Sequence, residues 1–217
     1  MTADSCRHVE RDCGFDSFHS SHSRWSETGR LREGRSAPTT GCVQTRRPAP
    51  TIQLRVLYVF VILAHDRRRV LHFNVTEDPT AAWTARQIVE AFPDAPVPRY
   101  VVRDRDGIYG HGFTARVDGL GIRQVLISAR SPWQNCYAER AIGSVRRECL
   151  NHVIVMNEWH LRRILKSYMG YYHRSRTHLS LNKDAPESRP EQDLQAGRII
   201  QIPEVGGLHH RYERRAA

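Results

Sequence analysis

Lysine is almost absent from this chain of 217 residues, which has 33 lysines and arginines in all. The two lysines are Lys166 and Lys183, so arginine supplies the other 31 basic residues. The formal net charge is +10, which makes a polyanion a reasonable partner. A GC-rich genome would also favour arginine over lysine. Charge alone therefore leaves nucleic-acid binding and codon bias equally open.

Long apolar runs and paired cysteines are also scarce. The longest apolar run, residues 56–64, has the length of a strand and falls short of the ~18 residues that a membrane span needs. The five cysteines are odd in number and scattered, which argues against a disulfide framework and favours a reducing compartment. The N-terminus lacks an apolar signal region, so we expect a cytoplasmic protein without a membrane partner.

Residues 1–50 differ in amino-acid composition from the rest of the chain. They are rich in Ser, Arg, Gly, Thr and His and show no apolar periodicity, which predicts an irregular, disordered arm. Cys6, Cys13, His19 and His22 fall within it, but their spacing fits no usual zinc finger. We therefore expect no zinc site in the arm.

Apolar periodicity begins near residue 55. A buried strand and a second strand form a hairpin, and Asp78-Pro79 then supplies an N-cap and a first-turn proline for a helix. The long helix near residue 140 has an apolar stripe formed by Ala138, Ala141, Ile142, Val145 and Cys149. We expect a mixed α/β layer fold. The predicted strands are residues 55–63, 70–75, 99–103 and 122–127, and the predicted helices follow residue 79 and span residues 113–120, 135–150 and 158–173.

Two carboxylates are placed where metal-dependent phosphodiester chemistry would need them. Such reactions commonly use two metals, and hard ions such as Mg²⁺ or Mn²⁺ require carboxylates on rigid elements. Asp104 ends a predicted strand, and Glu139 lies on a helix face with Gly143 and Arg146, where the arginine could hold a phosphate. A solvated helix face carrying one acid and one base explains the same pattern, and composition alone favours that interpretation.

Three ordered motifs change this balance. Asp104 is followed five residues later by Tyr109, and Asn135 precedes Glu139 by four, with 34 residues (105–138) between the two acids. A third motif spans residues 171–181 and continues to Ala185-Pro186. In order and separation these motifs resemble those of DDE-type insertion-sequence transposases and of the retroviral-integrase-like catalytic core, over residues 54–190.

The resemblance implies a ribonuclease-H-like α/β fold, with a mixed sheet and flanking helices, at residues 51–190. Residues 191–217 would be a basic polar tail. It also implies DNA transposition and DNA integration by metal-dependent strand transfer, with Mg²⁺ or Mn²⁺ as cofactor. The implied partners are transposon ends and target DNA, bound by a homo-oligomer, in a bacterial cytoplasm and on the nucleoid.

Carried over by position, Asp104 would be the second metal-binding carboxylate and Glu139 the third. Asp106 is a rival for Asp104, but it fits the distance to Tyr109 less well. The residues to which we assign DNA contacts are Asn135, Arg140, Arg146 and Arg147.

The family's first aspartate has no counterpart in this sequence. It is expected on the opening strand about ten residues before Arg55, which is the position of Thr45, and residues 41–50 contain no acid. Pro48 and Pro50 argue against a central strand there, so we expect the regular first strand to be missing. Asp66 cannot substitute, because it lies in the hairpin turn. A frameshift, a truncation with a new start or a wrong start codon would explain the change of composition near residue 50.

Without the first carboxylate we expect the chain to be inactive or impaired, because a missing catalytic group often costs orders of magnitude in rate. Three alternatives stay open. The aspartate could be supplied from elsewhere in an active enzyme. The chain could be a non-catalytic DNA-binding protein that modulates an intact transposase by mixed assembly. It could also have no function and fold poorly, because a missing central strand exposes an edge.

Overall fold

The computed structural model describes residues 40–45, 49–51, 55–93 and 97–216. The predicted arm up to residue 39, including the four candidate zinc residues, lies outside them. Among the described residues, no helix is both long and apolar enough to cross a membrane.

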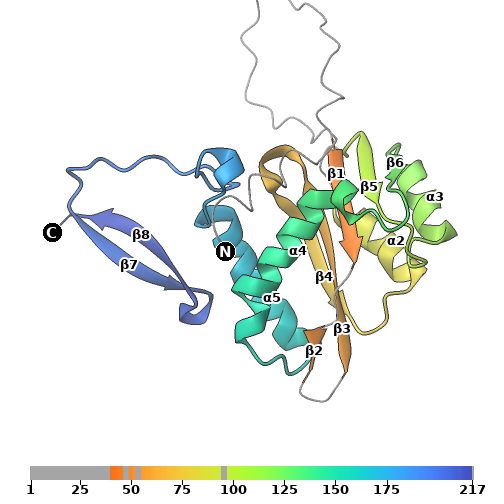
Figure 1. Ribbon diagram of the computed structural model, residues 1–217, viewed down its shortest axis with the longest axis horizontal. Helices are drawn as coiled ribbons and strands as arrows, with labels where there is room; N and C mark the ends of the chain where they lie inside the picture. Colours follow the sequence, from red (N-terminus) through yellow and green to blue (C-terminus); the bar gives the residue numbers. More distant parts are fainter. Residues whose placement is uncertain (1–39, 46–48, 52–54, 94–96, 217) are drawn as a thin grey trace, which may run out of the picture.

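A six-stranded mixed sheet forms the centre of the molecule (Figure 1). The long strand β3 pairs antiparallel with β4 and with β1, and β1, β5 and β6 then run parallel to one another. A short strand, β2, pairs with β3 further along, opposite Val56 and Leu57. The strands are β1 (Thr40–Thr45), β2 (Ala49–Pro50), β3 (Val56–Ala64), β4 (Val70–Thr76), β5 (Tyr100–Arg103) and β6 (Arg123–Leu126).

The prediction that the first strand is missing was wrong. β1 lies between β3 and β5, with Gly41 opposite Ala64 on one side and opposite Val101 on the other. The prolines do not prevent this, because the segment paired on both sides ends at Cys42 and β1 itself ends at Thr45, before Pro48. The predicted arm therefore contains strands from residue 40 onward, and the sheet has its central strand.

Helices cover both faces of the sheet (Figure 1). On one face, α4 (Cys136–Glu148) and α5 (Glu158–Arg174) bury their apolar sides against β3 and β4. On the other face, α2 (Ala81–Glu90) and α3 (His111–Gly119) form a second core. Alternate residues of β3 enter the two cores, such as Leu63 and Ile62, because successive strand side chains point to opposite faces. This explains why the strand is an unbroken apolar run.

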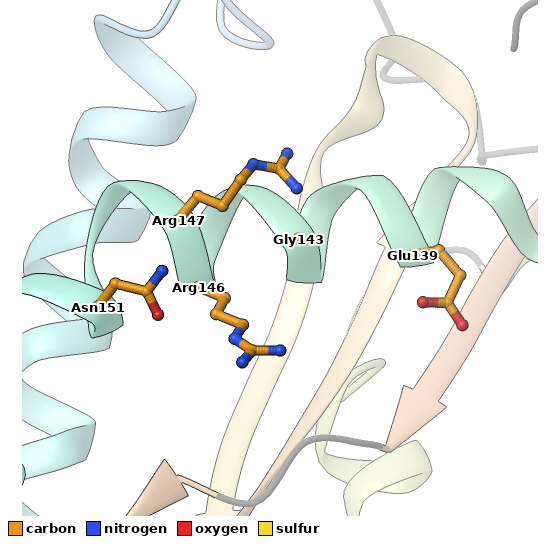
Figure 2. A pocket seen from close by; sticks show the side chains of 5 residues that line it. All are labelled: Glu139, Gly143, Arg146, Arg147 and Asn151. Carbon is orange, nitrogen blue, oxygen red and sulfur yellow. The ribbon is translucent and has the colours of Figure 1, made fainter. Parts of the chain in front are cut away.

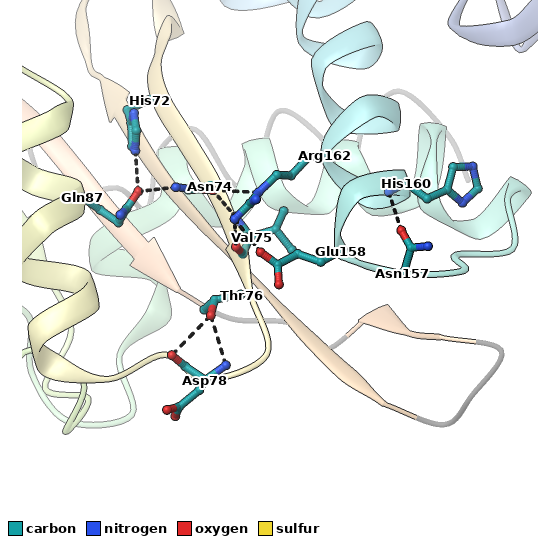
Figure 3. Close-up of polar contacts among 10 residues, drawn as sticks. All are labelled: His72, Asn74, Val75, Thr76, Asp78, Gln87, Asn157, Glu158, His160 and Arg162. Carbon is teal, nitrogen blue, oxygen red and sulfur yellow. Dashed lines mark hydrogen bonds and ion pairs between the residues drawn. The ribbon is translucent and has the colours of Figure 1, made fainter.

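A polar bridge ties α5 and α2 to the middle of β4 (Figure 3). The buried Gln87 accepts a hydrogen bond of 2.7 Å from the amide of Asn74 and lies 2.9 Å from a ring nitrogen of His72. Arg162 donates to the Asn74 side chain at 3.0 Å and to the Val75 carbonyl at 2.7 Å. Because its partners lie on β4, Arg162 fixes the first half of α5 against the sheet.

The predicted polar tail contains a hairpin of β7 (Arg198–Glu204) and β8 (His209–Arg215). The ring of His209 stacks on Tyr171 of α5 at 4.2 Å, and its Nε2 lies 2.7 Å from the Glu148 carbonyl oxygen. These contacts dock the hairpin on the helical layer.

Cys136, at the start of α4, is disulfide-bonded. Cysteine pairing depends on proximity in the fold, which the spacing of five cysteines along the chain does not reveal. Cys149 at the other end of the helix is a free, buried thiol, and burial raises its pKa to about 11.

Candidate active site

Asp104 is held at the carboxyl end of β5. Arg103 anchors the strand end, because its buried guanidinium donates to the Gln124 side chain at 2.8 Å and to the Asp104 carbonyl at 3.1 Å. The Asp104 carboxylate accepts the Asp106 amide at 3.1 Å, and the Asp106 carboxylate accepts the Ile108 amide at 3.3 Å. Each aspartate thus helps to shape the turn after the strand, and Asp104 is the one directly at the strand end.

The end of β1 lies beside this turn. β1 and β5 are parallel, with Cys42 opposite Val102. Continued by two residues, the same register places Gln44 at the level of Asp104, and β1 ends one residue later at Thr45. The predicted position of the first carboxylate, Thr45, is thus the last residue of β1, one residue past the level of Asp104, and neither Gln44 nor Thr45 is an acid.

Glu139 lies in the first turn of α4 and is half-buried. The helix that carries it packs against β1 and β3. Asn135 immediately precedes α4 and is only 4% exposed, so its predicted DNA contact stays a prediction. Arg140 is exposed, one residue after Glu139.

A pocket of about 320 Å³ runs along α4 from Glu139 to Asn151 (Figure 2). Glu139, Gly143 and Arg146 line it, as their helical spacing predicted, and Arg147 also lines it. In Figure 2, Glu139 and Arg146 project to one side of α4 and Arg147 to the other. We refer to these five lining residues as the α4 pocket.

Gly143 gives Arg147 its position in the α4 pocket. A Cβ atom at residue 143 would lie 3.0 Å from a terminal nitrogen of the Arg147 guanidinium, which therefore folds back over the glycine. Such folding toward the helix N-terminus is the usual direction of long helical side chains. The pocket lining thus contains two guanidinium groups and one carboxylate, and its net positive charge suits a phosphate.

The metal ligands present among the described residues do not complete a two-metal centre. Asp104 and Glu139 occupy separate elements, and the part of the chain that the structure describes has no group of three or more His, Cys, Asp or Glu residues able to hold a metal ion. Threonine at residue 45 cannot supply the missing carboxylate. The residues therefore do not fit the pair of divalent metals that the resemblance implies.

A polar cluster between the end of α4 and α5 was not predicted from the sequence. Arg176 donates to both carboxylate oxygens of Glu148, at 2.8 and 2.7 Å, and the Tyr168 hydroxyl donates to the same carboxylate at 2.7 Å. Burial raises the pKa of Glu148, but the hydrogen bonds from Arg176 and Tyr168 outweigh it and the net shift is downward. Burial lowers the pKa of neighbouring His178 to about 4, with Arg176 contributing.

Further contacts explain part of the third sequence motif. Arg67, in the β3–β4 turn, donates to the Asp184 carboxylate at 2.6 Å and to the carbonyls of Ala185 and Pro186. His173 accepts the Val70 amide at 3.0 Å. The motif thus joins α5, the β3–β4 turn and the following segment, which is a structural role.

The described architecture is the ribonuclease-H-like fold of integrase catalytic cores. One similar solved structure is "CryoEM structure of simian T-cell lymphotropic virus intasome in complex with PP2A regulatory subunit B56 gamma". The match has a TM-score of 0.58 and 13% identity, and it covers 98% of this chain and 79% of that chain. Another is the catalytic core domain of BIV integrase, with a TM-score of 0.48 and 14% identity over 69% of this chain and 91% of that one.

Sequence comparison agrees over part of the chain. Residues 120–186 match the family described as "Integrase core domain", a segment that includes Glu139 and the whole α4 pocket. No curated protein matches. Over residues 120–186 the chain is thus similar to an integrase core domain, and the solved structures add a likeness in fold.

Asn151 was missed as a pocket residue. It follows α4 in a short 3-10 turn, η4 (Leu150–His152), so the helical spacing that identified Gly143 and Arg146 does not extend to it. No sequence pattern would have found it.

Proposed function

We propose that this chain is a transposase- or integrase-type core that binds DNA through the α4 pocket but does not by itself carry out strand transfer. The observation that carries the proposal is the end of β1 at Thr45, beside the turn that holds Asp104. Within the proposal, the strand that would carry the first carboxylate is present, and it ends without an acid.

The charge of the α4 pocket supports DNA as the ligand. Arg146 and Arg147 are exposed, and each guanidinium can bind a phosphate through paired hydrogen bonds. Glu139 is the one acid among the lining residues, so the pocket is net positive. The whole chain has a net charge of +10, which would attract a polyanion from a distance.

The absent carboxylate supports the loss of catalysis. Phosphoryl transfer depends on charge stabilisation at fixed positions, and residues that act as a unit lose most of their effect when one is removed. Within the proposal, DNA binding and catalysis are therefore separable in this chain. The proposed setting is the bacterial cytoplasm and nucleoid, with a homo-oligomer holding paired DNA ends.

The experiment compares binding with nicking on the same DNA. Purified wild-type protein is titrated against a labelled duplex, and against supercoiled plasmid DNA carrying the sequence that flanks the gene, with Mn²⁺ present. We expect salt-sensitive binding and no nicking above the Glu139→Gln background. Replacing Arg146 and Arg147 by glutamine should weaken binding and lower the salt slope by about 0.9 for each lost phosphate contact.

The matched control is the double replacement of Arg86 and Arg116 by glutamine, because these exposed arginines lie on α2 and α3, across the sheet. Equal losses in both double variants would contradict binding at the α4 pocket. Nicking by wild type that Glu139→Gln abolishes would instead show an active enzyme whose aspartate comes from elsewhere.

A second candidate function is modulation of an intact transposase by mixed assembly. It is favoured by the same pair of observations, a complete central sheet and a replaced carboxylate, because a folded but inactive copy can occupy a place in an assembly. The test adds this chain to an active relative. Falling strand-transfer activity at constant DNA would support inhibition, and unchanged activity would exclude it.

A further inference from the structure

The exposed side of α5 carries a row of residues that neither the α4 pocket nor the sheet uses. Trp159, Arg163, Lys166, Gly170 and Arg174 follow one another at spacings of four, three, four and four residues. In a helix of 3.6 residues per turn this spacing places all five on one face. We call this face the α5 stripe.

The stripe faces solvent because the opposite side of α5 is in the core. Leu161, Leu165 and Tyr168 are fully buried there. On the stripe, Arg163, Lys166 and Arg174 are exposed, and Trp159 is 66% exposed. A tryptophan this exposed at the end of a core helix is unusual for a surface that stays bare.

No carboxylate neutralises the stripe from its own helix. The one acid in α5, Glu158, forms an ion pair with Arg162. Arg162 is also committed to β4, through Asn74 and Val75 (Figure 3). In the part of the chain that the structure describes, no ion pair joins Arg163, Lys166 or Arg174 to an acid. Three cations therefore remain available to an external anion.

Two contacts hold arginine side chains of the stripe along the helix surface. The Arg163 guanidinium lies 5.2 Å from the centre of the Trp159 ring, as a cation–π pair. A Cβ at Gly170 would lie 3.0 Å from a terminal nitrogen of Arg174, so this arginine folds over a glycine just as Arg147 does over Gly143. Both long helices thus lay an arginine along their surface.

We propose that the α5 stripe is a second DNA-backbone surface, separate from the α4 pocket, and that it holds duplex DNA through phosphate contacts without reading sequence. This rests on the proposed DNA-bound function. From Trp159 to Arg174 the helix rises about 22 Å, long enough to follow several phosphates of a duplex. A symmetric dimer through this face would place its cations against one another, which opposes self-association.

The experiment measures affinity and salt dependence of the full-length chain on a random-sequence, fluorescein-labelled DNA duplex by anisotropy. The variant replaces Arg163, Lys166 and Arg174 together by glutamine. If all three contact phosphate, the slope of log K against log salt should fall by about 2.7 in magnitude, and affinity near physiological salt should fall by about tenfold or more. Circular dichroism melting verifies that the variant is folded.

The charge-matched control replaces Arg86, Arg116 and Arg123 by glutamine, three exposed arginines on α2, α3 and β6. It removes the same net charge from other elements. A loss of slope in the stripe variant well beyond that of the control is the expected result. Equal losses in the two variants would overturn the proposal, because they would report net charge alone.

Trp159 supplies a second measurement. If DNA lies on the stripe, titration should change the tryptophan fluorescence of wild type, and Trp159→Phe should remove most of the change. Wild type that binds DNA with no change in slope for the stripe variant would overturn the stripe and leave the proposed function standing. Wild type that binds no duplex would overturn both. A stripe variant that alters sedimentation but not DNA binding would show a protein interface instead.

Discussion

Removing the carboxylate of Glu148 should lower the free energy of unfolding more than replacing an exposed charged side chain does. Arg176 contacts both of its oxygens, and the two side chains are 22% and 25% exposed. In Glu148→Ala the guanidinium keeps its mostly buried position without an acidic partner. Breaking one side of a buried pair costs roughly 3–5 kcal/mol, and partial exposure places this pair near 3 kcal/mol. For a chain of this size that corresponds to a melting temperature lower by about 6–12 °C.

The assay is urea unfolding and thermal melting of wild type and Glu148→Ala, with Glu77→Ala as the matched control. Glu77 pairs with Arg55 at 3.1 Å, but those side chains are 42% and 62% exposed, so its loss should cost about 0.5 kcal/mol or less. A Glu148→Ala protein that unfolds with the free energy of the control would refute the reasoning.

The pH dependence of the same pair gives an independent check. The pKa of Glu148 is lowered in the folded state, because the hydrogen bonds from Arg176 and Tyr168 outweigh burial. The folded protein therefore binds the proton less well than the unfolded chain, and the stabilisation is present above the ordinary glutamate value and lost as pH falls through the folded value. Glu148→Gln should flatten the acid side of the stability curve, whereas an unchanged curve would show that the pair contributes nothing.

Three further predictions concern other parts of the chain. Gly143→Ala should stabilise α4 by up to about 1 kcal/mol, measured by thermal melting, because alanine favours the helix more than glycine does. The same change should weaken DNA binding, measured by fluorescence anisotropy, because the new methyl group displaces the flexible end of Arg147. Burial, with Arg68, lowers the pKa of His65 to about 4, so stability should decline as pH falls from 6.5 toward 4, and His65→Phe should reduce that decline in pH-dependent melting. Sequencing the locus and translating the DNA upstream of codon 55 in all three frames separates two outcomes: an aspartate about ten residues before Arg55 in another frame would show a frameshifted remnant, and its absence would favour the non-catalytic DNA-binding alternative.

The elements from β3 to α5 could be predicted because their apolar spacing is locally regular. The run before the β3–β4 turn and the stripe on α4 each have the period of the element they form. The shared face of Glu139, Gly143 and Arg146 followed from the same geometry and became the α4 pocket. Asn151 lies past the helix end, where that geometry stops.

β1 could not be predicted, because its pairing is set by neighbours far away in the chain. Its sequence, Thr-Gly-Cys-Val-Gln-Thr, has little apolar pattern, and the ladders to β3 and β5 override that weak local preference. The hairpin of β7 and β8 did have a signal. Gly206-Gly207 marks its turn, with φ of +65° and +90°, and the isoleucines before it are typical of a strand.

The most direct test of the central claim is to restore a carboxylate at the end of β1. Wild type, Thr45→Asp and Thr45→Asp with Glu139→Gln are compared for Mn²⁺-dependent nicking of supercoiled plasmid DNA, after melting confirms that each is folded. The account predicts nicking by Thr45→Asp alone. Nicking by wild type, or a folded and inactive Thr45→Asp protein, would contradict the claim that residue 45 holds the place of the missing carboxylate.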